Sequence, residues 1–167
     1  EKNKAVILKK RLGFSKCRLS LAIPKSEKYS GLEYFQNKNI ATSYPVILQQ
    51  FLDKNGIKAA IHEISGSVEI APNIGLAEGI CDIVSTGSTL LSNGLVEVEV
   101  IMKSEAVLIT NPNLEAAKQG LLEELIFRIE SVQRAKNNKY VVLNAPNEKI
   151  AEITSILPGM KSPSIVA

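Results

Sequence analysis

The stretch from residue 69 to residue 90 constrains this chain more than any other part of its sequence. An apolar run at residues 80–84 meets a compact polar cluster at residues 85–89, which holds four hydroxyl side chains and one glycine. This pattern predicts a strand that ends in a turn and opens a helix. Such a turn exposes several backbone N–H groups beside the hydroxyls, and a phosphate group requires that set of donors.

A single acid interrupts the apolar run. Asp82 stands just before the turn, where its carboxylate can accept hydrogen bonds from sugar hydroxyls. The acid and the turn together predict a site for a phosphorylated sugar. The plainer alternatives are that residues 85–89 only cap a helix, and that Asp82 only caps the turn.

The composition narrows the class of protein and of partner. The chain has 167 residues, of which 45% are hydrophobic and 22% charged, as expected for a soluble globular protein with one ordinary domain or two small ones. A net charge of +3 is too small to indicate nucleic acid. No apolar run approaches the roughly 18 residues of a membrane span, and no signal peptide opens the chain. Because Cys17 and Cys81 lie far apart, we expect no disulfide framework and a cytoplasmic location.

The apolar periodicity predicts an alternating series of strands and helices. Strands are expected at residues 5–8, 18–23, 39–43, 57–64, 81–84, 96–101, 106–109 and 140–143. Helices or helical turns are expected at residues 45–54, 67–69, 75–80, 114–136 and 147–157, the last capped by Asn147. This order argues for an α/β sheet with helices on its faces and some antiparallel strands around 96–109. The apolar stripe of the longest helix should pack against a substantial surface, or stay exposed if nothing covers it.

Several short motifs occur in one order along the chain and carry a family resemblance. They are residues 14–21, 40–45 (IATSYP), 66–72 (GSVEIAP), 75–77, 81–90 (CDIVSTGSTL), 93–95, 97–99 and 139–146. No single motif is specific. Their shared order, from about residue 12 to residue 160, resembles that of ATP phosphoribosyltransferase, the first enzyme of histidine biosynthesis.

The resemblance implies a two-lobed α/β fold like that of type II periplasmic binding proteins, with the active site in the cleft between the lobes. By that analogy, residues 12–108 form the complete second lobe, and residues 1–11 and 109–160 belong to a partial first lobe that includes the long helix at 114–136. Residues 161–167 would begin the linker to a regulatory domain. The chain begins without Met and ends in an apolar run, so we expect an inactive fragment that lacks most of the first lobe and the histidine-binding domain.

The resemblance also implies a reaction and its partners. N1 of ATP attacks C1 of phosphoribosyl pyrophosphate (PRPP), and pyrophosphate leaves with Mg²⁺. The transition state should have oxocarbenium character, so positioning and electrostatics carry the reaction and no protein nucleophile is needed. The expected substrates are ATP and PRPP, and Mg²⁺ is expected to arrive bound to substrate rather than in a protein metal site. The intact enzyme is expected to be a homo-oligomer, either a dimer or a hexamer.

The same resemblance assigns roles to particular residues. The residues expected to cradle the 5-phosphate of PRPP are Ser85, Thr86, Gly87, Ser88 and Thr89. Asp82 would hold the ribose hydroxyls, and Glu69 would face the same cleft and help to orient ribose or Mg²⁺. Tyr44 would line the nucleotide pocket. The alternatives are that Glu69 is a first-turn helix acid and that Tyr44 is ordinary packing.

Other polar residues are expected to have structural roles. His62 lies in an alternating strand without a metal partner nearby, and Cys81 fills an apolar strand. Glu97 and Glu99 are most simply the solvent face of a strand. A competing function, from a different class, is a non-catalytic anion- or solute-binding module of the same two-lobed fold. The acid beside the cradle argues against that alternative, because a carboxylate hinders a site built for a small anion alone.

Overall fold

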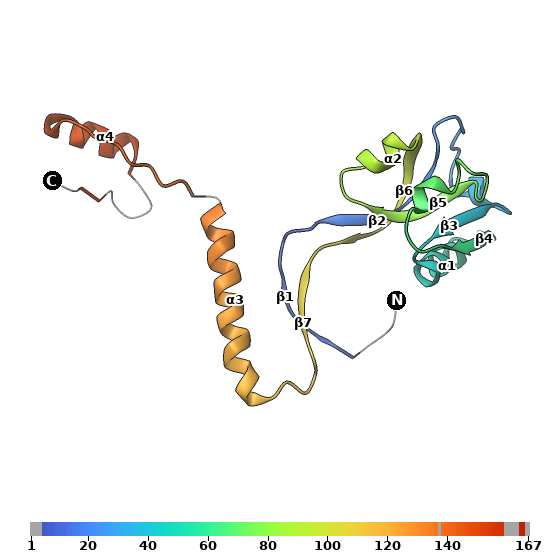
Figure 1. Cartoon of the computed structure of the whole chain (residues 1–167), viewed down its shortest axis with the longest axis horizontal. Coiled ribbons are helices and arrows are strands. Elements are labelled where there is room, and N and C mark those ends of the chain that lie inside the picture. Colours follow the sequence, from blue (N-terminus) through green and yellow to red (C-terminus); the bar gives the residue numbers. More distant parts are fainter. Residues whose placement is uncertain (1–4, 137, 159–163, 166–167) are drawn as a thin grey trace. The chain divides into compact units, whose positions relative to one another are not determined.

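The computed structural model describes residues 5–136, 138–158 and 164–165, in two compact units. The first unit comprises residues 1–114 and the second residues 115–167. The first unit holds all seven strands that the structure assigns among the described residues (Figure 1). The predicted α/β class is confirmed.

The centre of the first unit is a five-stranded mixed sheet with the strand order β4-β3-β5-β2-β6. These strands are β2 (Cys17–Pro24), β3 (Asn39–Thr42), β4 (Ala60–Glu63), β5 (Gly79–Val84) and β6 (Leu95–Ser104). The strand β3 runs parallel to both β4 and β5, whereas β2 runs antiparallel to both β5 and β6. The parallel strands therefore end at one edge of the sheet, next to the start of β2.

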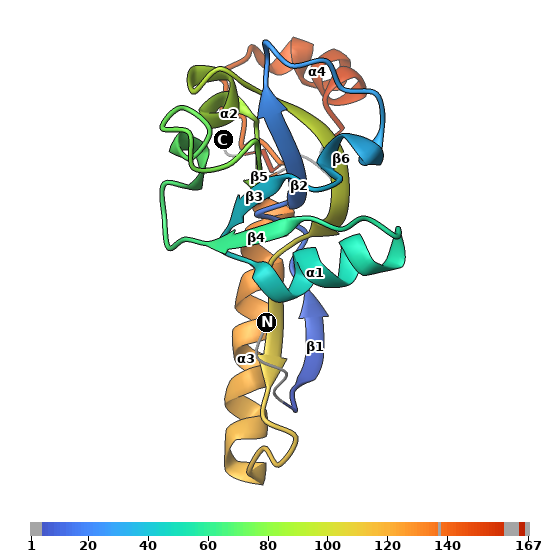
Figure 2. The same cartoon turned by 90° about the vertical axis from the view of Figure 1, so that its right-hand side faces the viewer.

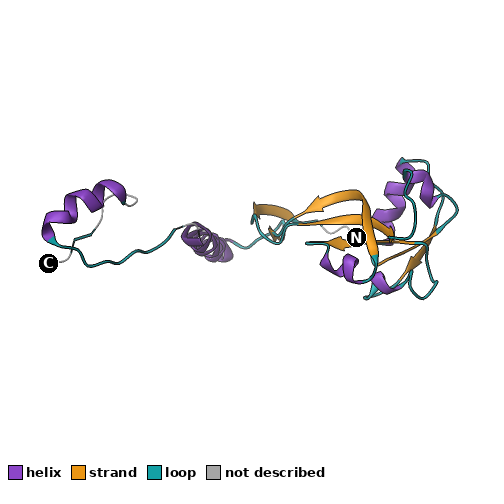
Figure 3. Cartoon of the chain, turned by 90° about the horizontal axis from the view of Figure 1, so that it is seen from above, coloured by secondary structure: helices purple, strands orange, loops and turns teal. Residues whose placement is uncertain are grey.

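A second, two-stranded sheet continues from this one. The strands β1 (Ile7–Arg11) and β7 (Val107–Thr110) pair antiparallel and lie directly before β2 and directly after β6 in the chain. The N–H of Leu12 donates to the carbonyl of Ala106 at 2.9 Å, which extends the pairing toward the large sheet. Figure 3 draws both sheets in orange.

Helices cover the two faces of the large sheet. The helix α1 (Pro45–Lys54) lies on one face, and α2 (Ser88–Ser92) and the 3-10 turn η2 (Val68–Ile70) lie on the other (Figure 2). Because successive strand residues point to opposite faces, the core divides in two. The α1-side cluster consists of Leu19, Leu21, Ile23, Phe35, Ile40, Leu48, Leu52, Ile57 and Cys81. The α2-side cluster consists of Ala22, Ala41, Val68, Ala71, Ala77, Ile80, Val84, Leu90 and Leu95.

Most predicted elements of the first unit are present, with one clear error. The helix predicted at 45–54 is confirmed as α1, with Tyr44 as its cap residue, and the helical turn predicted at 67–69 is present as η2. The predicted helix at 75–80 is wrong. Gly75 has a positive φ of 73°, which interrupts a helix, and Gly79 already belongs to β5. A 3-10 turn, η1 (Leu32–Phe35), lies between β2 and β3, where no helix was predicted.

The second unit contains α3 (Ala116–Lys136), η3 (Asn147–Lys149) and α4 (Ile150–Ile156). None of residues 116–136 is buried. Of the apolar side chains of this helix, Leu121, Leu125, Phe127 and Val132 are exposed, and Leu122, Ile126 and Ile129 are partly exposed. The predicted strand at 140–143 is wrong, since residues 138–146 form no regular element. Asn147 is not the cap residue of α4, which is Lys149.

Candidate functional site

The candidate site lies where β5 ends. Residues 85–89 follow β5 directly, at the carboxyl edge of the parallel strands β3 and β5. Ligands of open α/β sheets bind at this edge. The structure therefore puts the predicted phosphate loop in a position that suits a ligand site.

The loop presents its hydroxyls to solvent. The side chains of Ser85, Thr86, Ser88 and Thr89 are exposed. Gly87 has a φ of 84°, a left-handed conformation that glycine adopts without a steric penalty. The hydroxyl oxygens of Thr86 and Ser88 lie 2.9 Å apart and hydrogen-bond to each other. Within the described part of the chain, the N–H groups of Thr86 and Gly87 donate to no backbone carbonyl, so these donors are free for a ligand.

Asp82 lies on the α2 side of the sheet, on β5. It pairs with Ser20 of β2, and its neighbours on the same face are Ile80 and Val84, both buried. Asp82 itself is half-buried. Burial raises the pKa of its carboxyl, the N–H of Ile83 lowers that pKa by donating a hydrogen bond, and the charge of Glu69 raises it again.

Glu69 reaches this face from a different element. It lies in η2 and is partly exposed. Its element η2 packs against β5, and the charge of Glu69 contributes to the raised pKa of Asp82. The structure thus places the turn that carries Glu69 against the strand that carries Asp82, although 12 residues separate the two acids in the chain.

Tyr44 occupies a different position. It lies at the same carboxyl edge, after β3, but it packs against the α1-side cluster. Its N–H donates to the hydroxyl of Thr42 at 2.9 Å, and that hydroxyl donates to the carbonyl of Cys81 at 2.7 Å. Tyr44 is therefore not among the residues that meet on the face of Asp82 and Glu69.

Arg18 and Glu97 belong to the neighbourhood of the loop, and the sequence analysis missed them. The prediction that Glu97 and Glu99 form a plain solvent face is wrong. Glu97 accepts two hydrogen bonds from Arg18 and one from Ser20, and Glu99 accepts one from Tyr29 at 2.8 Å. The available signal was the pair of polar residues at positions 18 and 20 in an otherwise apolar strand.

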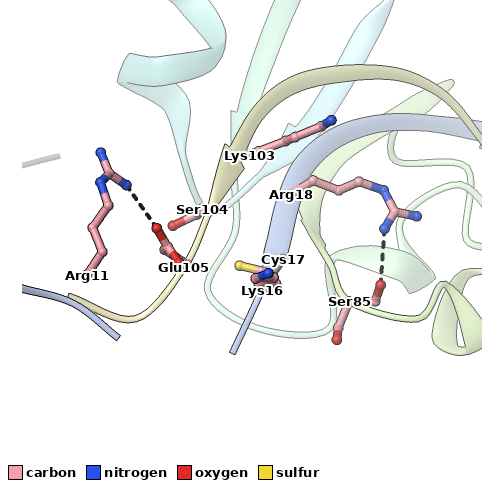
Figure 4. A pocket seen from close by; sticks show the side chains of 8 residues that line it. All are labelled: Arg11, Lys16, Cys17, Arg18, Ser85, Lys103, Ser104 and Glu105. Carbon is pink, nitrogen blue, oxygen red and sulfur yellow. Dashed lines mark hydrogen bonds and ion pairs between the residues drawn. The ribbon is translucent and has the colours of Figure 1, made fainter. Parts of the chain in front are cut away.

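Arg18 lies between two surface depressions that border the loop. The first has a volume of about 590 Å³ and is lined by Arg11, Lys16, Cys17, Arg18, Ser85, Lys103, Ser104 and Glu105 (Figure 4). The second has a volume of about 230 Å³ and is lined by Arg18, Thr86, Gly87, Leu90, Leu91, Leu95, Val96 and Glu97. Four of the side chains around the first depression are cationic, so the potential beside the loop favours anions.

Neither a metal site nor a membrane helix is found in the part of the chain that the structure describes. Its residues form no group of three or more His, Cys, Asp or Glu side chains that could hold a metal ion. None of its helices combines the length and the apolar character needed to cross a membrane.

Comparison with known proteins decides the family. The sequence model of ATP phosphoribosyltransferase matches residues 1–131, and that of the C-terminal domain of the same family matches residues 135–167. The chain belongs to the ATP phosphoribosyltransferase family. It is 63% identical over 165 residues to the enzyme of Parabacteroides distasonis and 60% identical over 166 residues to that of Bacteroides thetaiotaomicron.

The chain spans less than two thirds of the length of those relatives. The alignments cover 99% of the chain but only 58% and 59% of the two enzymes. The C-terminal-domain match begins at residue 135, well before the linker expected at 161–167. It also includes residues that the sequence analysis assigned to the first lobe.

Solved structures agree with the expected fold. The ATP phosphoribosyl transferase (HisG:HisZ) complex from Thermotoga maritima aligns with a TM-score of 0.61 and 28% identity, over 80% of this chain and 63% of that one. A putative L-cystine ABC transporter from Listeria monocytogenes aligns with a TM-score of 0.59 and 13% identity, over 79% of this chain and 61% of that one. At that identity the second likeness concerns the fold alone. The predicted likeness in fold to the periplasmic binding proteins is confirmed.

Proposed function

We propose that this chain supplies the phosphoribosyl-binding lobe of an ATP phosphoribosyltransferase, which transfers the phosphoribosyl group of PRPP to N1 of ATP and releases pyrophosphate. That reaction is the first step of histidine biosynthesis. The single observation that carries the proposal is the exposed hydroxyl loop at residues 85–89 with the carboxylates of Asp82 and Glu69 beside it, in a chain of this family.

In this proposal the loop binds the 5-phosphate of PRPP. The hydroxyls of Ser85, Thr86, Ser88 and Thr89 and the free N–H groups of Thr86 and Gly87 would donate to its oxygens. Gly87 lets the backbone approach the phosphate closely, because it has no side chain and keeps a left-handed conformation. The nearby cations Lys16 and Lys103 have no ion-pair partner among the described residues, so their field adds to the attraction for a phosphorylated ligand.

Asp82 would accept hydrogen bonds from the ribose hydroxyls. Partial burial raises the pKa of the Asp82 carboxyl. Hydrogen bonds donated by the ribose hydroxyls would take the place of those from water and favour the charged carboxylate. A carboxylate beside the ribose also stabilises the positive charge that develops at C1 as pyrophosphate leaves. Glu69 would contribute to the same field from η2. Tyr44, on the α1 side, remains a proposed wall of the nucleotide pocket.

Magnesium enters this proposal as part of the substrate. The described residues offer two neighbouring carboxylates, Asp82 and Glu69, and no cage of three acidic or nitrogen ligands. Such a pair suits Mg²⁺ that keeps most of its water and arrives on the diphosphate of PRPP. The ion would supply charge neutralisation for the departing pyrophosphate.

The organisation of the whole protein is also proposed. We assign residues 12–108 to one catalytic lobe, and residues 1–11 with residues 109–134 to the other lobe. The second family match favours a domain boundary near residue 135 rather than at 161. A cytoplasmic homo-oligomer, with ATP as the second substrate, completes the proposal.

Calorimetry with this chain tests the function without requiring turnover. PRPP with Mg²⁺ and sulfate are titrated separately into the wild-type chain and into the Asp82→Asn variant. We expect PRPP to bind more tightly than sulfate, and Asp82→Asn to weaken PRPP binding about tenfold, because a hydrogen bond to a charged group is lost. Sulfate binding should not weaken, because the substitution removes a charge that repels an anion.

The matched control is Asp53→Asn, which removes the same charge from an exposed position on α1. It should leave both affinities unchanged. If sulfate binds as well as PRPP and Asp82→Asn changes neither, the chain is a non-catalytic anion-binding module and the transferase proposal fails.

A further inference from the structure

The guanidinium of Arg18 connects β6 to the first residue of the loop. Its Nε and Nη2 donate to the two carboxylate oxygens of Glu97, each at 2.5 Å. Its third nitrogen, Nη1, donates to the carbonyl oxygen of Ser85 at 3.1 Å. Figure 4 shows Arg18 extending toward Ser85 with this bond drawn.

Two neighbouring strands fix the direction of that third nitrogen. The hydroxyl of Ser20, a residue only 1% exposed, donates to Oε1 of Glu97 at 2.7 Å, so the carboxylate is itself held from β2. The Arg18 and Glu97 side chains are 30% and 23% exposed. Because a guanidinium is planar and rigid, two bonds to one carboxylate determine where its remaining nitrogen points.

The bond to Ser85 falls where regular pairing stops. Arg18 is the strand partner of Val84, the last residue of β5. The carbonyl of Ser85 lies one residue beyond the ladder, so Arg18 supplies the donor that a further strand residue would otherwise give. In a planar trans peptide, the carbonyl and the following N–H point in opposite directions. Holding the Ser85 carbonyl therefore also sets the direction of the Thr86 N–H.

We propose that Arg18, oriented by Glu97, is a positioning residue that fixes the peptide between Ser85 and Thr86 and so holds the loop in the conformation that receives a phosphate. Only the identity of the ligand depends on the proposed function. The ordering of the loop is a property of the protein without ligand, and it is measured separately.

The rival explanation is that Arg18 contacts the ligand itself. In that case, replacing Arg18 would weaken binding but leave the unliganded loop as ordered as before. Replacing Glu97 separates the two explanations further, because Glu97 repels a phosphate and can assist binding only through Arg18.

Binding is measured first, with the 167-residue chain and ribose 5-phosphate as the probe. The variants are Arg18→Lys, which keeps the charge but loses the planar fork, Glu97→Gln, which weakens the grip on Arg18, and the double variant. We expect each single variant to weaken binding about tenfold. The double variant should be little worse than either one, because both changes break the same connection.

The neighbouring ion pair gives matched controls. Arg11 and Glu105 line the same depression and pair with each other at 3.1 Å, but neither is bonded to the loop. Arg11→Lys and Glu105→Gln repeat the same chemical changes a short distance away. Affinity for ribose 5-phosphate should stay within about twofold of the wild type in both.

Loop order is measured second, by ¹⁵N relaxation of the ligand-free chain. We expect backbone order parameters of about 0.85 for Thr86, Gly87 and Ser88 in the wild type, and values below about 0.6 in Arg18→Lys and Glu97→Gln. Far-UV circular dichroism checks that each variant is folded. Since the two variants change different strands, either one alone suffices if the other fails to fold.

The outcomes are distinct. A wild-type loop that is already flexible, or a loop that stays rigid in both variants, overturns the positioning role even if binding weakens. If the wild-type chain does not bind ribose 5-phosphate but the variants still loosen the loop, the proposed ligand is wrong and the positioning role of Arg18 stands.

Discussion

The two units of this chain differ in how far their apolar residues are buried. In the first unit, two buried clusters lie between a five-stranded sheet and the helical elements on its faces. In the second, α3 has apolar residues at helical spacing but no buried one, and Leu121, Leu125, Phe127 and Val132 are 46–68% exposed. Apolar residues at helical spacing occur in both α1 and α3, so this spacing alone does not decide burial. A second layer of structure is needed to cover an apolar face.

The most direct way to break this comparison is to remove the same side chain from each unit. Phe35 is fully buried and lies 5.1 Å from Tyr34 and 6.2 Å from Tyr29 between ring centroids, whereas Phe127 is 68% exposed. We expect Phe35→Ala to destabilise the first unit by about 3–5 kcal/mol. Phe127→Ala should change the free energy of unfolding of the first unit by no more than about 0.5 kcal/mol.

Urea unfolding, followed by the near-ultraviolet circular dichroism of the tyrosines beside Phe35, measures both effects. A large loss with Phe127→Ala would mean that α3 packs against a surface in solution, for example on a second copy of the chain. The contrast between the units would then be wrong.

Replacing one glycine in each unit tests the comparison further, because the two changes in stability should have opposite signs. A Cβ on Gly79 would lie 2.8 Å from the ring of Phe35 and 3.2 Å from the carbonyl oxygen of Ala22, whereas a Cβ on Gly120 in α3 would meet nothing within 4 Å. Gly79→Ala should destabilise the first unit by about 1–3 kcal/mol through overpacking. Gly120→Ala should stabilise α3 by about 1 kcal/mol, since alanine favours a helix.

Urea unfolding reports the first change, and amide hydrogen exchange along α3 reports the second. If Gly79→Ala is neutral, Phe35 has room to move aside, and the packing between β5 and η1 is looser than the contact distances indicate.

Gly79 also explains the main error in predicting the fold. Leu76 and Ile80 have helical spacing, and the local pattern at 75–80 therefore predicts a helix. What decides the conformation is distant in sequence. Gly79 fits beneath Phe35, and Ile80 pairs with Ala41 of β3 and Ala22 of β2. Strands with strong alternation, such as β2 and β6, were predictable because their pattern is local.

The residues of the candidate site likewise differ in how well a local sequence pattern predicts them. The hydroxyl loop and Asp82 are contiguous in sequence, so their place at the end of a strand could be predicted from the residues alone. Arg18 is 67 residues from Ser85 and 79 residues from Glu97 along the chain, and only the sheet brings them together. The polar residues at positions 18 and 20 stand out in an apolar strand, but no local pattern shows which residue of another strand they bind. For that reason Glu97 was predicted to be a simple surface residue.

Replacing Asp82 should have an effect of intermediate size, in which ligand binding weakens while the stability of the fold rises. Burial raises the pKa of Asp82 above its ordinary value, so the folded state binds its proton more tightly than the unfolded state. Stability therefore falls as the pH rises from the unfolded pKa through the folded pKa, and the penalty is complete at neutral pH. Asp82→Asn removes this penalty while it weakens PRPP binding.

Thermal unfolding at pH 7 and at about pH 4 tests the sign. The Asn variant should melt at or above the wild-type temperature at pH 7, and the difference should shrink at the lower pH. A variant that melts well below the wild type at pH 7 would mean that Asp82 supports the fold rather than a ligand.

The smallest expected effect compares two ion pairs that differ in their surroundings. Arg18–Glu97 and Arg128–Glu124 both join Nη2 to a carboxylate oxygen at 2.5 Å, but the side chains are 30% and 23% exposed in the first pair and 73% and 54% in the second. Glu124→Gln should therefore weaken α3 by only about 0.3–0.5 kcal/mol, the typical contribution of an i,i+4 pair. Because both charges face water, about 1 M salt, with a screening length of about 3 Å, should abolish the effect. Amide exchange along α3 measures it.

The Arg18–Glu97 pair should respond differently to salt. Glu97 is also bonded to the hydroxyl of the buried Ser20, and Arg18 to the carbonyl of Ser85. Partly buried charges that are hydrogen-bonded on several sides are screened much less than exposed ones. The lowered unfolding midpoint of Glu97→Gln relative to the wild type should thus persist in about 1 M salt. If salt removes that difference as well, the pair behaves like a surface ion pair, and it could not hold the loop in one conformation.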